Sequence, residues 1–442
     1  MSTRRPRQPE RDGGLFYGWY IVGALFFATF LGVGARQGYG VFVKTWEEDF
    51  GVSVGAVSTA AAVGWFVNGI SQPIFGRLTD RFGGRPVLIS SLVVMGVATA
   101  AMAAASNILM LIAIYGFVVS FAAGGISFVP AGALVARWFQ RRRGTAMAFL
   151  TAGGSAGGLI MVPFAAYLLI VADWRTVWLV LGGMMLFLGL PVFALVLRGK
   201  PADMGLEPDG GEADGNRGTG RRLTGEQAGP LHAERWRDSF RSPPMWQLSF
   251  GFWVCGVTTA IPAVHYVRWA SEEGISAGTA ALAFGALSAI NGVGVIAVGW
   301  VSDRMQRRIL LGGVYMVRCT AYLALIFLDG SAALWGFAVL GGMSWLATVP
   351  LTTSLTADVY GLRHLGTLSG LVFMSHHLGG ALAVLLTGVV FDRFGTYDPA
   401  FGAGAVFLLL AGLVSLSIRE RTYSARYQPQ PAAVAAPAGS DD

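Results

Sequence analysis

The sequence contains 442 residues, of which 54% are hydrophobic and 13% are charged. Soluble domains carry about 25% charged residues, so this composition excludes an ordinary soluble protein. The net charge of +7 does not indicate nucleic acid as a partner, because the basic residues follow the pattern of a membrane topology. The two cysteines, Cys255 and Cys319, both lie in apolar runs, which excludes a disulfide framework and a thiolate metal site.

In chain order, a basic polar tail (1–16) precedes a first apolar segment that is too long for a signal peptide. Twelve segments reach the roughly 20 apolar residues that a membrane-spanning helix needs. They cover about 17–43, 53–77, 86–105, 108–136, 144–171, 174–197, 244–270, 279–302, 308–328, 332–357, 366–391 and 399–418. We therefore predict an all-α integral membrane protein with twelve transmembrane helices.

Polar segments divide the predicted helices into two sets of six. Residues 198–243 are rich in Gly, Pro and charge, which is typical of a flexible linker. This predicts an N-terminal half at 17–197, a C-terminal half at 244–418 and a polar tail at 419–442. With the N-terminus inside, 26 of the 32 Lys and Arg residues fall on the inner side. The positive-inside rule therefore predicts that both termini and the linker are cytoplasmic.

Short matches at a nearly constant spacing indicate that the two halves are copies of one unit. GRLTDRF (76–82) and GWVSDRM (299–305) share G-x-x-x-D-R at an offset of 223 residues, and the same offset relates two Asn-Gly pairs at 68 and 291. An offset of 222 relates Gly-Thr at 144 and 366, and Gly-Gly at 157 and 379. A repeated six-helix unit is typical of transporters that bind substrate between the repeats.

The loop GRLTDRFGGRP (76–86) resembles the signature loop of the major facilitator superfamily, and GWVSDRMQRR (299–308) is similar to its second copy. Two further stretches, DGGLFYGWYIV (12–22) and WFQRRRGTAMAFLTAGGSAGG (138–158), resemble the monocarboxylate transporter and oxalate–formate exchanger branch. The resemblance covers essentially the whole chain. It implies transport by alternating access, with the central cavity between the halves.

Both copies of the signature loop are predicted to gate the cytoplasmic side. A carboxylate such as Asp80 can pair with a neighbouring arginine or with the positive N-terminal end of a helix. In the family the loop holds the two halves together in the outward-open state. The candidate gating residues are Gly76, Asp80, Arg81, Arg85, Gly299, Asp303 and Arg304.

The stretch GARQGYGVF (34–42) places Arg36 inside the first apolar segment. An arginine within a membrane helix usually faces a cavity or a partner, and a guanidinium can hold a carboxylate by two parallel hydrogen bonds. By resemblance, ARQGY corresponds to a substrate-contacting segment of oxalate–formate exchangers, so Gln37 and Tyr39 are candidates too. The alternative is an arginine that extends outward to the membrane interface.

The eleventh segment carries His376 and His377 where the exchanger branch commonly has a lysine. Histidine exchanges protons near neutral pH, which suits proton coupling or substrate binding. The alternative is a packed, hydrogen-bonded histidine.

The eighth segment departs from the family pattern N-G-x-G-R-x-x-x-G, whose arginine binds the substrate carboxylate. Here the sequence is NGVGVIAVG (291–299), so Val295 replaces that arginine and Asn291 stands where eukaryotic members have an acid. Either Arg36 supplies the positive charge from the other half, or the substrate is not a simple carboxylate.

Other polar groups in the apolar segments have weaker signals. Arg318 is expected to pair with polar groups of neighbouring helices, whereas Trp345 is a candidate for the cavity wall. Asn68 and Gln72 either line the cavity or join helices by hydrogen bonds. His265 and Arg268 are candidates for gate residues or interfacial anchors.

The sequence carries no soluble catalytic constellation: no Walker loop, no metal-spaced His/Cys cluster and no G-x-S-x-G. We therefore predict no enzyme and no cofactor. The predicted function is secondary transport of a small organic anion, by proton symport or anion exchange, in a bacterial inner membrane. Its partners are the anion, protons and membrane lipid. An exporter of a neutral or amphiphilic solute is the alternative, and a non-transporting sensor is a further one.

Overall fold

The computed structural model describes residues 15–209, 229–231 and 234–427. Helices are the regular secondary structure of these residues, and the one β-type pairing among them is an isolated bridge between Phe139 and Asp209. The predicted all-α class is confirmed. Most of the predicted tails (1–14 and 428–442) and parts of the linker (210–228 and 232–233) lie outside the described residues.

The first part of the described chain forms the helices that precede the linker. They are α1 (Tyr17–Gln37), η1 (Gly38–Phe42), α2 (Val43–Phe50), α3 (Val54–Phe82), α4 (Gly84–Ala101), η2 (Met102–Ala104), α5 (Ile108–Leu111), η3 (Ile112–Val119), α6 (Ser120–Gly125), α7 (Phe128–Trp138), α8 (Arg143–Val171), α9 (Trp174–Gly183), η4 (Met184–Gly189) and α10 (Leu190–Val196). Two short 3-10 turns lie in the linker region, η5 (Pro201–Met204) and η6 (Trp236–Arg241).

The second part begins at α11 and ends close to the last described residue. Its helices are α11 (Pro243–Glu272), α12 (Ala277–Ser302), α13 (Arg307–Phe327), α14 (Gly330–Ser344), α15 (Thr348–Tyr360), α16 (Leu365–Phe394), α17 (Asp398–Leu416) and α18 (Glu420–Tyr423).

Eleven stretches of the described residues are long and apolar enough to cross a membrane. The remaining predicted segment coincides with α3, which has 29 residues. A span needs about 20 residues, so α3 also meets the length requirement. The first segment runs straight into η1 and α2 and extends to Phe50, seven residues beyond its predicted end at 43, because the backbone continues in tight helical turns past Gln37.

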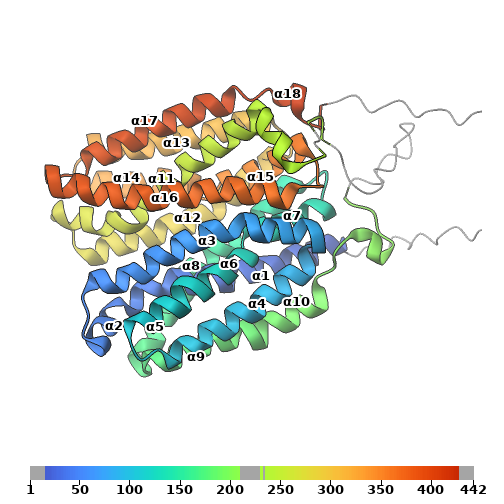
Figure 1. The fold of residues 1–442 in the computed structure, drawn as a ribbon. Coiled ribbons are helices and arrows are strands. Elements are labelled where there is room, and N and C mark those ends of the chain that lie inside the picture. Colours follow the sequence, from blue (N-terminus) through green and yellow to red (C-terminus); the bar gives the residue numbers. More distant parts are fainter. Residues whose placement is uncertain (1–14, 210–228, 232–233, 428–442) are drawn as a thin grey trace, which may run out of the picture.

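The helices form two groups that lie side by side (Figure 1). One buried apolar cluster draws almost entirely on helices before the linker, and the second draws almost entirely on helices after it. The long contacts between the groups are α3 against α16 and α8 against α12. The start of α1, the linker and α18 lie at the same end of the bundle, which we call the linker side (Figure 1).

Two predicted helices are interrupted at equivalent places. The fourth segment breaks between α6 and α7, and the tenth breaks between α14 and α15. Pro130 is the third residue of α7 and Pro350 is the third residue of α15. A proline clashes with the carbonyl four residues earlier, and these carbonyls belong to Ile126 and Leu346, at the two breaks.

Glycines allow close contact where two helices cross within the first group. Gly157 of α8 lies against the backbone of Phe30 and Gly34 of α1, so a methyl group there would collide with main-chain atoms. Close approach through small residues is a common way for membrane helices to associate.

We therefore expect Gly157→Ala to lower the melting temperature of the purified protein in detergent, because the backbone of α1 cannot move aside as a side chain could. Gly23→Ala is the matched control, since a methyl group at Gly23 of α1 would meet open space. Alanine should be neutral or gain up to about 1 kcal/mol of helix propensity there. Equal melting temperatures for the two variants would contradict the close α1–α8 contact.

Candidate functional site

Two carboxylates at the linker side bind helix ends that belong to the opposite group. Asp80 of α3 accepts hydrogen bonds from the backbone N–H groups of Gly366 and Thr367 at 2.8 and 2.7 Å, and from the Thr367 hydroxyl at 2.6 Å. These donors form the N-terminus of α16. Because the free N–H groups of a helix start carry partial positive charge, the carboxylate is bound as an anion at a cationic end.

The second carboxylate repeats this arrangement with the groups exchanged. Asp303, directly after α12, accepts from the backbone of Gly144 and Thr145 at 2.7 and 2.9 Å, and from the Thr145 hydroxyl at 2.7 Å. These donors form the N-terminus of α8. The Asp-Arg and Gly-Thr repeats of the sequence are thus paired between the halves. The aspartate of each half binds the Gly-Thr pair of the other half.

Glycine is required at the contact points of these helix pairs. A methyl group on Gly76 would strike the carbonyl of Gly366, and one on Gly366 would strike the carbonyl of Gly76. A methyl group on Gly299 would likewise strike the carbonyl of Gly144. We call the two contacts together the linker-side seam.

The arginines predicted with this loop do not bridge the seam. Arg81 stacks on its neighbour Phe82, with 5.0 Å from the guanidinium carbon to the ring centre. Arg85 donates to the carbonyl of Ala194 in α10 at 3.1 Å. Arg304 donates to the carbonyl of Trp300 at 2.9 Å and stacks on its ring. Of the two partners considered for Asp80, the structure selects the helix end.

A buried charge cluster lies beside the seam, and sequence analysis missed it. Asp358 of α15 is bound by Arg143 of α8 at 2.8 Å and also by Arg307 of α13, which lies 3.6 Å from Asp303. Side chains of all three members are at most 6% exposed. The available signal was an acid, Asp358, directly after the tenth apolar segment (332–357). We call this group the Asp358 cluster.

In the first group, Arg36 lies in the last turn of α1 and is half-buried. Its Nε atom is buried without a hydrogen-bond partner in the described structure. Gln37 is exposed and lies over Gly158 of α8. Tyr39 is buried instead. Its hydroxyl donates to the carbonyl of Val57 at 2.7 Å, and its ring packs against Tyr115 at 4.4 Å, so this geometry gives Tyr39 a packing role.

The two histidines of α16 face different neighbours. His376 packs against Phe252 of α11, with the tilted rings 5.0 Å apart between centres, and its Nδ1 atom is buried without a partner in the described structure. His377 lies 5.5 Å from the ring of Trp65 in α3, and its Nδ1–H donates to the carbonyl of Phe373 at 2.9 Å. The two imidazole rings are 5.4 Å apart. The pair therefore lies at the contact of α16 with both groups of helices.

Arg318 of α13 is completely buried. It donates to the Cys255 thiol at 3.3 Å, to the Thr258 hydroxyl at 3.4 Å, and to the carbonyls of Ser344 and Trp345 at the break between α14 and α15. The last carbonyls of a helix carry partial negative charge, so the end of α14 takes the place of a carboxylate. Pairing of Arg318 with polar groups of neighbouring helices is what the structure shows. Trp345 is half-buried, with its ring 5.9 Å from the guanidinium carbon.

Asn291 joins this break to the opposite group. Its oxygen accepts from the backbone N–H of Leu346 at 2.9 Å, and its amide donates to the Ser155 hydroxyl of α8 at 2.7 Å. Val295, one turn farther along α12, is fully buried against Ala148 and Ala152 of α8. The position of the family arginine is therefore part of an apolar contact between the groups.

The equivalent asparagine of the first group also serves its interrupted helix. Asn68 donates to the carbonyl of Ser120 in α6 at 2.9 Å and accepts from Gln72 at 3.2 Å. The Ser127 hydroxyl, at the start of α7, donates to the Gln72 side chain at 2.8 Å. Asn68 and Gln72 thus join helices, which was one of the two interpretations of these residues.

His265 and Arg268 both pack on α16. His265 lies 3.4 Å from the carbonyl of Val384, and the guanidinium carbon of Arg268 lies 4.8 Å from the ring centre of Phe391.

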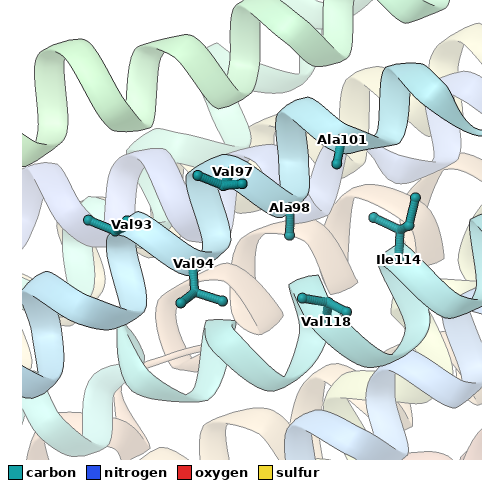
Figure 2. A pocket seen from close by; sticks show the side chains of 7 residues that line it. All are labelled: Val93, Val94, Val97, Ala98, Ala101, Ile114 and Val118. Atoms are coloured by element: carbon teal, nitrogen blue, oxygen red, sulfur yellow. The ribbon is translucent and has the colours of Figure 1, made fainter.

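The described residues contain no group of three or more His, Cys, Asp or Glu side chains that could hold a metal ion. An apolar hollow of about 380 Å³ between α4 and η3 is lined by aliphatic side chains (Figure 2), so it offers nothing to hold a charged solute.

Four basic side chains lie within the apolar helices: Arg36 of α1, Arg318 of α13, and His376 and His377 of α16. Within the described residues, no carboxylate lies within ion-pair distance of either arginine. At 1.5 Å per residue, Arg318 and His377 lie about 17 Å from the linker-side ends of α13 and α16, near mid-depth. Arg36 lies about 28 Å from the linker-side end of α1. We call these four side chains together the interior basic residues.

Comparison with known proteins gives consistent matches over the length of the chain. The family model described as the Major Facilitator Superfamily matches residues 25–384. An uncharacterized MFS-type transporter, YcxA of Bacillus subtilis (strain 168), is 25% identical over 90% of this chain and 94% of its own. Monocarboxylate transporter 11 of Mus musculus is 24% identical over 94% of this chain and 90% of its own.

Solved structures share the fold at lower identity. The fucose transporter FucP in its outward conformation superposes with a TM-score of 0.66 at 17% identity, covering 89% of this chain and 97% of its own. The human organic anion transporter MFSD10 also gives 0.66, at 13% identity, covering 92% of this chain and 100% of its own. The described helices therefore follow the architecture of these transporters.

We expect Asp358→Asn to destabilise the protein strongly, because Arg143 and Arg307 would lose their shared carboxylate in a buried site. Removing one partner of a buried ion pair costs about 3–5 kcal/mol. Thermal unfolding in detergent measures this. The control is Asp238→Asn, which removes the more exposed pair with Arg241 at 3.7 Å and should cost at most about 1 kcal/mol. Similar losses in both variants would contradict the buried pairing.

Proposed function

Because the chain belongs to the Major Facilitator Superfamily, we propose that it is a secondary active transporter of a small organic anion, such as a mono- or dicarboxylate. The observation that carries the proposal is that the two arginines among the interior basic residues, Arg36 and Arg318, have no carboxylate within ion-pair distance among the described residues. Charge buried in a membrane protein is costly and usually functional. The carbonyls at the end of α14 already fill this role for Arg318, so an anionic substrate would supply the negative charge at Arg36.

Arg36 is the proposed anchor for the substrate. The Nε atoms of Arg36 and Arg318 both lack a hydrogen-bond partner in the described structure, but Arg318 is completely buried and already uses both terminal nitrogens, whereas Arg36 is only half-buried. A guanidinium remains charged at physiological pH and matches the two oxygens of a carboxylate. We propose that Gln37 adds a neutral hydrogen bond, and that Asn291 and Trp345 belong to the opposite wall.

The histidine pair is the proposed second contact. His377 uses Nδ1 for the Phe373 carbonyl, which leaves Nε2 to bind a proton or a substrate oxygen. Proton symport and anion exchange both fit this arrangement. FucP, which shares this fold, is named a fucose:proton symporter. This name supports the proposal that transport is coupled to protons.

The linker-side seam is the proposed gate. We propose that the linker side faces the cytoplasm of a bacterial cell, on the basis of its Lys and Arg excess. Closure there by Asp80 and Asp303 then corresponds to the state in which the other side is open. Transport would require both carboxylates to leave their helix ends and rebind in each cycle.

A second candidate is the export of a neutral or amphiphilic solute on the same fold. The burial of Val295 in an apolar contact favours it, because the residue that binds carboxylates in related proteins is absent. The charge of the transported solute separates the two proposals. A non-transporting sensor is the least supported, and exchange of labelled solute across a membrane would exclude it.

The proposed function is tested by uptake into proteoliposomes of labelled lactate, pyruvate, oxalate and uncharged analogues of the same size. Uptake of at least one acid, and of none of the uncharged analogues, is expected. An inward proton gradient should accelerate uptake if the mechanism is symport, and His377→Gln should then reduce the acceleration. No uptake, counterflow or thermal shift across a broad carboxylate panel would exclude the anion proposal.

Arg36→Ala is expected to abolish uptake while expression stays unchanged, because the proposed anchor for the substrate is lost. Arg36→Lys should bind more weakly than the parent, since it keeps the charge and loses the two parallel donors. Arg393→Ala, at an exposed arginine near the end of α16, is the control. Parent-like uptake by Arg36→Ala would remove this residue from the site.

Asp80→Asn and Asp303→Asn are each expected to shift the protein toward an open linker side, because a neutral amide binds a helix N-terminus less strongly than a carboxylate. Spin labels at Phe82→Cys and Arg363→Cys, exposed positions on opposite sides of the seam, measure the opening as a longer distance. Asp398→Asn, in the first turn of α17, is the control. An unchanged distance distribution in both seam variants would exclude the gate.

A further inference from the structure

A polar hollow of about 440 Å³ lies at the linker side, outside the proposed transport site. Arg77 lines it from the end of α3, and His364 lines it from the segment before α16. The third wall is the linker, from which Glu234, Arg235, Trp236 and Arg237 contribute. The hollow therefore touches both groups of helices and the segment that connects them. We call it the linker pocket.

The linker pocket is cationic, with three arginines against one glutamate. None of the three has an ion pair with a described carboxylate, whereas Arg241 in the same 3-10 turn pairs with Asp238 at 3.7 Å. The cavity wall also has a defined shape. The guanidinium carbon of Arg237 lies 5.2 Å from the ring centre of Trp236. The Nε2–H group of His364 donates to the backbone carbonyl of Glu234 at 3.0 Å.

We propose that the linker pocket binds a phosphate group, carried either by an anionic phospholipid headgroup or by a free cytoplasmic phosphate. Arginine forks match the oxygens of phosphate and hold it by two donors at a time. A basic pocket beside membrane helices on the inner side is suited to an anionic headgroup. The exposed Trp246 at the start of α11 has an indole that donates to Phe240 of the same linker turn, a position typical of the membrane interface.

Occupancy of the linker pocket would favour the closed seam. Arg77 directly follows Gly76, which contacts Gly366, and His364 lies two residues before Gly366. A phosphate held by Arg77 and Arg235 therefore joins α3 to the linker turn that His364 binds at the start of α16, beside the Asp80 contact. Separation of these helices would divide the pocket walls. Binding itself does not depend on the transported solute, whereas the effect on transport rests on the proposed function.

The binding test uses the full chain and the double variant Arg77→Gln/Arg235→Gln, with Arg241→Gln as the matched control outside the pocket. Melting temperature is measured in detergent with inorganic phosphate against chloride at equal ionic strength. It is measured again in nanodiscs of phosphatidylcholine with and without phosphatidylglycerol. The parent and Arg241→Gln should be stabilised in at least one comparison, and the double variant in neither.

The two comparisons separate the sources of the phosphate. Stabilisation in nanodiscs alone assigns a lipid headgroup, and stabilisation by inorganic phosphate assigns a small anion. Equal responses of all three proteins, or no response of the parent in either comparison, would overturn the site. If the double variant does not fold, the single variant Arg235→Glu, at an exposed linker residue, gives the same comparison.

The seam is read independently with the spin labels at Phe82→Cys and Arg363→Cys. The ligand that stabilises the parent should increase the short-distance population at least twofold, and should not do so in the double variant. Binding without this increase would keep the site and overturn its coupling to the seam. This readout needs no transported solute, so a failure of the anion-transport proposal leaves it intact.

Discussion

The reciprocal binding of Asp80 and Asp303 to helix N-termini is the constraint on which the arrangement of the two groups depends. Each carboxylate satisfies two backbone N–H groups that a helix start leaves without partners, together with one hydroxyl. Each reaches from one group of helices to the other. These bonds can form only because Gly76, Gly299 and their partner glycines bring the backbones into contact.

The buried charge of Arg318 is stabilised by helix-end carbonyls instead of an acid. Arg318 is held by carbonyls at the end of α14, and these are exposed only because the helix stops there. The break follows from Pro350, and the matching break in the first group follows from Pro130. Asn291 and Asn68 then bind the freed backbone groups or their neighbours. The repeated asparagines and prolines are thus parts of one device that interrupts a helix at mid-depth in each half.

Much of the fold follows from the sequence, because membrane spans have simple requirements of length and polarity. The helical class and the family were predicted and are confirmed. For the site, sequence reasoning identified Asp80 and Asp303 from the repeated signature loop, and Arg36 and the histidine pair as polar groups within apolar segments. It treated the Gly-Thr repeats only as evidence of duplication. It gave Tyr39 a place at the substrate, whereas the hydroxyl of Tyr39 binds the carbonyl of Val57.

The sequence by itself determined the number and placement of apolar segments, the duplication and the identity of the unusual charges, because each of these is local along the chain. Only the tertiary structure decided which groups meet. Asp80 lies 286 residues from its partner Gly366, and Arg143 lies 215 residues from Asp358. No periodicity encodes such distances. They arise because the two groups pack side by side, so that the helix starts of one face the loop carboxylates of the other.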